Sequence, residues 1–184
     1  HSEKINDTAN SLPLLSKKII NNASLSFENL DAICISSGPG SFTGLRVGMS
    51  YAKGIAMALD IPIVPVSTFD SLAYKNTSEK LFTLIYSHGN TFYICEYSLD
   101  DGILLKSSEP KSILKENVLE LSRNIVFNGP TNIFEDFKAR NLKIEFIDLS
   151  VKNIIKIARQ NFNLLKTKSL DNLVPEYIGN FEVK

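Results

Sequence analysis

Residues 31–59 read DAICISSGPGSFTGLRVGMSYAKGIAMAL and contain three successive kinds of sequence. Residues 31–36 carry a continuous apolar run, which is typical of a short strand buried on both faces. Residues 37–43 are rich in glycine, serine and threonine and indicate a turn. From 44 to 59 the pattern is helical, and two residues can cap its start with a side-chain oxygen, Ser41 and Thr43. The stretch therefore predicts a strand, a glycine turn and a helix.

The predicted helix is unusual in its small residues. Gly44, Gly48, Ala52 and Ala56 recur at every fourth position and therefore share one side of the helix. Each glycine inside a helix costs about 0.8–1 kcal/mol relative to alanine, which indicates a compensating close approach of another backbone. Two interpretations stay open. The small residues pack on this domain's own sheet, or together with Leu45 they form a docking face for a partner helix.

Length and charge limit the classes of protein to which this chain can belong. The chain has 184 residues with 43% hydrophobic content, enough for one sizeable core or two small domains. Lys and Arg together number 20 and so do Asp and Glu, which argues against strong nucleic-acid binding by this chain alone. No run approaches the roughly 18 apolar residues of a membrane span. We expect a cytoplasmic protein without a membrane segment, and we interpret Cys34 and Cys95 as inert core thiols.

The rest of the chain alternates strands and helices. Before residue 76, the sequence predicts a helix around 12–20, a strand at 61–66 and a helix at 67–74 opened by a capping box of Ser67 and Asp70. After it, Gly-Asn and Asp-Gly turns predict an antiparallel meander. In this half, strands are expected at 81–87, 91–98, 103–107, 125–127 and 142–149. Helices are expected at 112–122, from 131 onward and at 150–167. This is an α/β protein with mixed sheets flanked by helices, divided into domains 1–76 and 77–184.

The sequence lacks the usual catalytic motifs. Gly44 is followed by Leu45 and Arg46, so a P-loop, which needs Lys and Ser/Thr there, is excluded. The two histidines, His1 and His88, have no partner at metal-ligand spacing. We therefore predict no catalytic residue and no metal site. What remains is the glycine turn, where backbone N–H groups near Gly38, Gly40 and Ser41 can cradle a phosphate or nucleotide.

Several motifs together resemble one family. SSGPGSFTGLRVG at 36–48, AKG at 52–54 and PVST at 65–68 resemble the signature of the TsaB (YeaZ) family. NGP at 128–130 and PEYI at 175–178 resemble its later glycine turn and its C-terminal Pro-x-Tyr-Leu segment. These are bacterial proteins needed to make threonylcarbamoyladenosine beside the anticodon of tRNA.

The resemblance implies an actin/RNase H-like (ASKHA) fold in two related halves. It also implies a non-catalytic scaffold and activator subunit that pairs with TsaD, the partner that holds the metal and transfers the threonylcarbamoyl group. The ATPase TsaE joins this pair, and tRNA is reached only through the complex. The resemblance implies no cofactor in this chain, with ATP or ADP at the partner interface. It also implies a homodimer through the same helical face when the partner is absent.

The chain departs from the family pattern in two places. The opening strands with their Asp-Thr turn have no match, so we expect about 30 further residues ahead of His1 in the native gene and an incomplete first half. Tyr86, His88 and Thr91 stand where many members carry Asp, Arg and Glu. Two alternatives stay open: an independent sugar-kinase-like or glycoprotease-like enzyme, and a homodimeric interaction module unrelated to tRNA.

Overall fold

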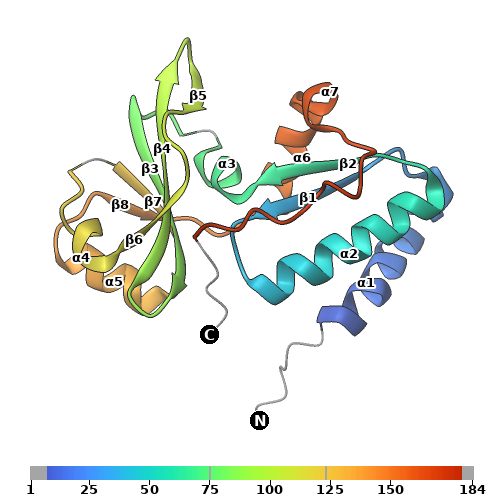
Figure 1. Ribbon diagram of the computed structural model, residues 1–184, viewed down its shortest axis with the longest axis horizontal. Helices are drawn as coiled ribbons and strands as arrows, with labels where there is room; N and C mark the ends of the chain where they lie inside the picture. The colour runs from blue at the N-terminus through green and yellow to red at the C-terminus, as the bar shows by residue number, and fades with distance from the viewer. Residues whose placement is uncertain (1–7, 75, 123, 180–184) are drawn as a thin grey trace.

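The computed structural model describes residues 8–74, 76–122 and 124–179, and His1 lies outside them. Within this part of the chain the strands form two sheets that lie side by side, each with its own helices (Figure 1). One sheet has two strands and the other has six. Hydrophobic clusters pack against both sheets, so each half has a core of its own.

The first half contains the stretch from which the fold was predicted. Its elements are α1 (Thr8–Asn22), the 3-10 turn η1 (Phe27–Asn29), β1 (Ile33–Gly38), α2 (Phe42–Leu59), β2 (Ile63–Ser67) and α3 (Thr68–Ala73). β1 and β2 pair in parallel, with Ile33 opposite Ile63. The predicted strand, turn and helix are confirmed, but β1 is half-buried along most of its length rather than buried on both faces. Ser41 is the cap of α2, because its hydroxyl accepts a hydrogen bond from the Gly44 amide at 3.3 Å.

The second half is built on the predicted meander. Its elements are β3 (Lys80–His88), β4 (Thr91–Asp100), β5 (Ile103–Lys106), β6 (Lys111–Leu114), α4 (Lys115–Val118), β7 (Asn124–Asn128), α5 (Thr131–Ala139) and β8 (Ile144–Phe146). The strand order is β5-β4-β3-β7-β8, with β6 paired to the free part of the β4 edge. β3, β4 and β5 are antiparallel, whereas β7 and β8 run parallel to β3.

The helix predicted at 112–122 is wrong. Residues 111–114 form β6 instead, with Ile113 opposite Phe92 of β4, and only Lys115–Val118 is helical. Strand pairing places Ile113 against the aromatic core of the second half. The stability gained from this packing outweighs the weak helical preference of an apolar pattern that is only eleven residues long.

The predicted second domain, 77–184, needs a correction at its C-terminal end. β3 begins at Lys80, but α6 (Val151–Gln160) and α7 (Phe162–Leu165) leave the second half and pack on the first sheet. Ile157 and Ala158 are buried against Val64 and Val66 of β2, and Thr167 bonds to Ile63. The helix predicted at 150–167 ends at Asn161, after which the short α7 follows. Residues 151–178 therefore belong largely to the first half.

None of the described helices is long and apolar enough to cross a lipid bilayer.

Candidate functional site

The small-residue side of α2 faces two different environments. Ala52 and Ala56 are 3% and 2% exposed and pack against Ile63 of the chain's own sheet. Their side chains are buried and cannot contact a partner, so we remove both residues from the predicted interface. For these two residues, packing on the domain's own sheet was the correct interpretation.

Gly48 and Gly54 differ from the two alanines in having open space beside them. A methyl group added to either glycine would meet no heavy atom within 4 Å outside the helix's own nearby backbone. Nothing in the described fold therefore requires glycine at these positions, although each lowers helix stability by about 1 kcal/mol relative to alanine. At the start of α2, Gly44 lies against Ser41, and Leu45 packs over the glycine turn, 3.1 Å from a Cβ built on Gly38.

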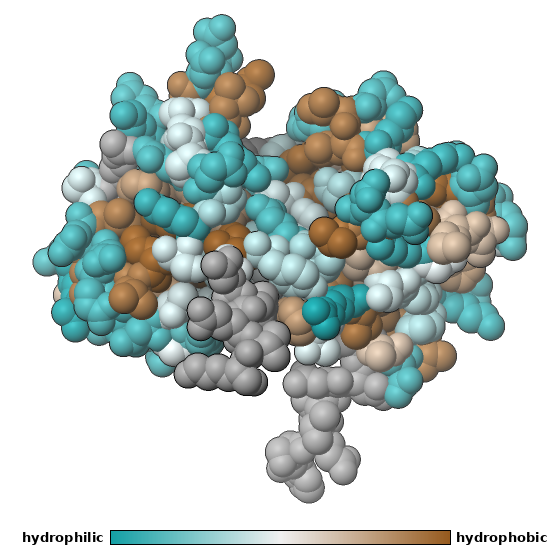
Figure 2. Space-filling view, in the orientation of Figure 1, coloured by the Kyte–Doolittle hydropathy of each residue, from teal (hydrophilic) through white to brown (hydrophobic). Residues whose placement is uncertain are grey.

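An apolar groove runs beside Gly54. It has a volume of about 410 Å³ and is lined by Phe27, Ser50, Tyr51, Gly54, Ile55, Ala58 and Leu59. Near it, Ser16 of α1 and Tyr51 of α2 are hydrogen-bonded through their hydroxyls at 2.7 Å. Exposed apolar side chains accompany these helices, including Leu14 at 70% and Met57 at 72%. Figure 2 shows hydrophobic side chains also reaching the surface over β5 and α7, away from α2.

The predicted phosphate loop is covered by the chain's own C-terminal segment. Gly38 has a φ of +112°, and a Cβ there would lie 2.9 Å from the carbonyl oxygen of Glu176. The Glu176 amide donates to the Ser37 carbonyl at 2.7 Å. Ser41 is occupied in capping Gly44, and a Cβ added at Gly40 would lie 4.0 Å from the Leu45 side chain. A phosphate at Gly38, Gly40 and Ser41 stays a prediction, and it would require this segment to leave.

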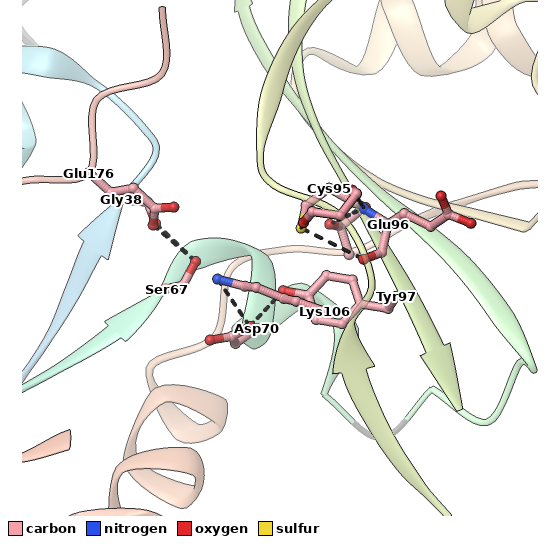
Figure 3. Close-up of polar contacts among 10 residues, drawn as sticks. Gly38, Ser67, Asp70, Cys95, Glu96, Tyr97, Lys106 and Glu176 are labelled. Carbon is pink, nitrogen blue, oxygen red and sulfur yellow. Dashed lines mark hydrogen bonds and ion pairs between the residues drawn. The ribbon is translucent and has the colours of Figure 1, made fainter. Parts of the chain in front are cut away.

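The predicted capping box of Ser67 and Asp70 does not form. Ser67 begins α3 but makes no side-chain cap bond, and both side chains turn instead toward a polar cluster between the two halves (Figure 3). Asp70 accepts a hydrogen bond from the Tyr97 hydroxyl at 2.6 Å and lies 3.6 Å from the Lys106 ammonium. Ser67 donates toward Glu176 Oε2 at 3.2 Å. Sequence spacing could not find this cluster, because its members come from β2, α3, β4, β5 and the C-terminal segment.

Burial raises the pKa of two weak acids at this cluster. Burial raises the pKa of the Tyr97 phenol, and the negative charge of Asp70 raises it further. Burial likewise raises the pKa of the Cys95 thiol to about 11. Both cysteines are free, with Cys95 buried and Cys34 half-buried in β1. Among residues 8–74, 76–122 and 124–179, no three His, Cys, Asp or Glu side chains are grouped so as to hold a metal ion.

The residues that depart from the family pattern serve the second core or a turn. Tyr86 packs edge-on against Phe92, with ring centroids 5.7 Å apart. Gly129 follows β7 where a Cβ would lie 2.6 Å from Tyr86 Cβ and 2.5 Å from Phe127 Cζ, so a larger residue cannot fit there unchanged. His88 is exposed and shares a hydrogen bond of 2.9 Å with Ser87. Thr91 opens β4 directly after the turn.

The fold and its helices define an actin/RNase H-like α/β protein. A family model described as TsaD, tRNA N6-adenosine threonylcarbamoyltransferase, matches residues 6–171. The chain belongs to this family, and within it to the TsaB (YeaZ) proteins.

The relatives carry consistent names. The "tRNA threonylcarbamoyladenosine biosynthesis protein TsaB" of Escherichia coli K12 is 27% identical over 183 residues, which is 92% of this chain and 79% of that protein. The protein of the same name from Bacillus subtilis 168 is 28% identical over 132 residues, 68% of this chain and 57% of that protein. The solved structure "YeaZ from Pseudomonas aeruginosa" has a TM-score of 0.70 at 19% identity, covering 94% of this chain and 85% of that one, and shares the fold. The chain therefore has a place in threonylcarbamoyladenosine biosynthesis.

Proposed function

We propose that this chain is a non-catalytic, cytoplasmic subunit that pairs with TsaD and supports transfer of the threonylcarbamoyl group to tRNA. The observation that carries the proposal is the family match across residues 6–171, together with relatives named for this pathway. A second observation supports a non-catalytic role. The polar groups between the two halves are engaged with each other, since Asp70 is bound by Tyr97 and Lys106.

The proposed partner surface lies on the half-buried start of α2 and the open positions that follow it. It comprises Gly44, Leu45 and Gly48, and we extend it to Gly54 and the apolar groove beside it. A helix-interior glycine with open space beside it, such as Gly48, lets another helix approach to backbone contact, as small residues do in tightly packed helix pairs. The occupant is a helix of TsaD. A second copy of this chain takes the same face when TsaD is absent.

The remaining components follow from this assignment. TsaE is the third member, and ATP or ADP binds at the partner interface rather than in this chain alone. With 20 basic and 20 acidic residues, the chain contributes little net charge for phosphate contacts, so tRNA is bound by the complex.

Co-purification separates this function from its rivals. The tagged full chain, expressed from its own locus, is expected to retain TsaD through washing at moderate salt. An interaction module unrelated to tRNA predicts only further copies of the chain in the eluate. An independent sugar-kinase-like or glycoprotease-like enzyme predicts turnover by the purified chain alone. Absence of TsaD from the eluate would count against the proposal.

A further inference from the structure

Residues 174–177 cross from the glycine turn toward the polar cluster, and we call this segment the strap. Glu176 attaches it at two points, and Figure 3 shows the one made by its side chain with Ser67. Its amide donates to the Ser37 carbonyl at 2.7 Å, and its side-chain Oε2 lies 3.2 Å from the hydroxyl of Ser67. The same Ser67 hydroxyl lies 3.4 Å from the carbonyl oxygen of Gly38. Ser67 is 9% exposed, so water has little access to its hydroxyl.

The hydrogen bonds at Ser67 are one proton short when Glu176 is ionised. A serine hydroxyl has a single proton to donate, whereas the Glu176 carboxylate and the Gly38 carbonyl are both acceptors. The two contacts must then share one proton in a three-centre hydrogen bond, in which each is weaker than a hydrogen bond with a proton of its own. If Glu176 carries a proton, it donates to the Ser67 oxygen, and Ser67 donates to Gly38. One added proton therefore satisfies both contacts.

Burial raises the pKa of Glu176 and favours the protonated state, whereas the charges around it act in both directions. Asp70 of α3 and Glu109, which follows β5, are like charges that raise its pKa, in addition to the larger effect of burial. Lys106 of β5 and the Ser67 hydroxyl lower it, but Lys106 is shared with Asp70 at 3.6 Å. The remaining titratable neighbours, Tyr97 and Cys95, have raised pKa values and add no charge.

We propose that Glu176 is a proton-controlled clasp, which fastens the strap to the glycine turn when protonated and loosens it when ionised. The strap extends to Tyr177, whose hydroxyl accepts a hydrogen bond from Arg46 Nε at 3.1 Å. The Tyr177 ring lies 5.4 Å from that of Phe42, in the first turn of α2. The clasp thus joins the polar cluster between the halves to the start of α2. This inference does not depend on the proposed function.

Glu176→Gln tests the clasp in the full-length chain, because glutamine keeps the shape and can donate to Ser67 at every pH. The matched control is Glu109→Gln, which removes a neighbouring like charge but leaves the strap contacts intact. A carboxyl group with a raised pKa in the folded state contributes stability that is present below its unfolded pKa and lost as pH rises through its folded pKa. The melting temperature of Glu176→Gln should therefore exceed that of the wild type by a margin that grows from pH 4 to pH 8.

Hydrogen exchange reports the strap directly. The Glu176 amide of the wild type should lose protection, relative to unfolded-chain rates, as pH rises, whereas the Glu176→Gln amide should stay protected and the Glu109→Gln chain should follow the wild type. Parallel melting curves for Glu176→Gln and wild type, or equal protection of this amide at all pH values, would overturn the clasp.

Discussion

Replacing Phe127 by alanine is expected to lower the free energy of unfolding by about 3–5 kcal/mol, the usual cost of removing a fully buried aromatic ring. Phe127 lies in β7 at 0% exposure. Its ring centroid is 5.9 Å from that of Phe137 and 6.3 Å from those of Phe92 and Phe146. Because several rings lose contacts at once, the surroundings cannot close the cavity by moving one side chain.

Urea unfolding followed by circular dichroism measures this effect. The control is Leu164→Ala in α7, where the side chain is 82% exposed and the change should stay within about 0.5 kcal/mol. A loss below about 1 kcal/mol for Phe127→Ala would mean that these rings do not form the tightly packed core of the second half.

Gly48→Leu is expected to weaken binding to TsaD while leaving the isolated chain folded. A leucine side chain in a contact sized for glycine costs about 1–3 kcal/mol, which corresponds to roughly five- to 140-fold weaker binding. In the isolated chain the same side chain enters open space, since no heavy atom outside the nearby helix backbone lies within 4 Å of a Cβ there. Leucine also has the better helix propensity by several tenths of a kcal/mol. The melting temperature should therefore stay constant or rise slightly.

The matched variant is Ala52→Leu, one helical turn further along α2. Ala52 is 3% exposed and packs on the chain's own sheet, so a leucine there should lower the melting temperature by overpacking. Calorimetric melting and titration of both variants against TsaD distinguish the open position from the packed one. A large fall in melting temperature for Gly48→Leu, or unchanged binding, would remove Gly48 from the interface.

Local patterns predicted the elements well where the contacts are also local. The apolar run before Ser37, the turn and the cap at Ser41 all involve neighbours within a few residues, and all are confirmed. The docking face of α2 was only partly predictable. Helical spacing grouped Gly48 with Ala52, but small size alone cannot tell a residue facing its own sheet from one facing open space.

Long-range contacts account for what the sequence could not predict. Ser67 and Asp70 have the spacing of a capping box, yet their partners Glu176, Tyr97 and Lys106 lie far along the chain. A side-chain hydrogen bond to a distant partner competes with the local cap, and no local pattern reveals it. The packing of α6 on β2 was not predicted for the same reason. The apolar side of α6 indicates that the helix is buried, but it does not indicate which of the two sheets the helix covers.

Reconstitution of threonylcarbamoyladenosine synthesis tests the proposed role most directly. Unmodified tRNA is incubated with a threonylcarbamoyl adenylate donor, ATP, TsaD and TsaE, with and without this chain, and the modified nucleoside is quantified by mass spectrometry. We predict sustained product only when TsaD and this chain are both present, and none from this chain alone. Equal product without this chain, or product from this chain in the absence of TsaD, would contradict its assignment as a non-catalytic subunit of the transferase.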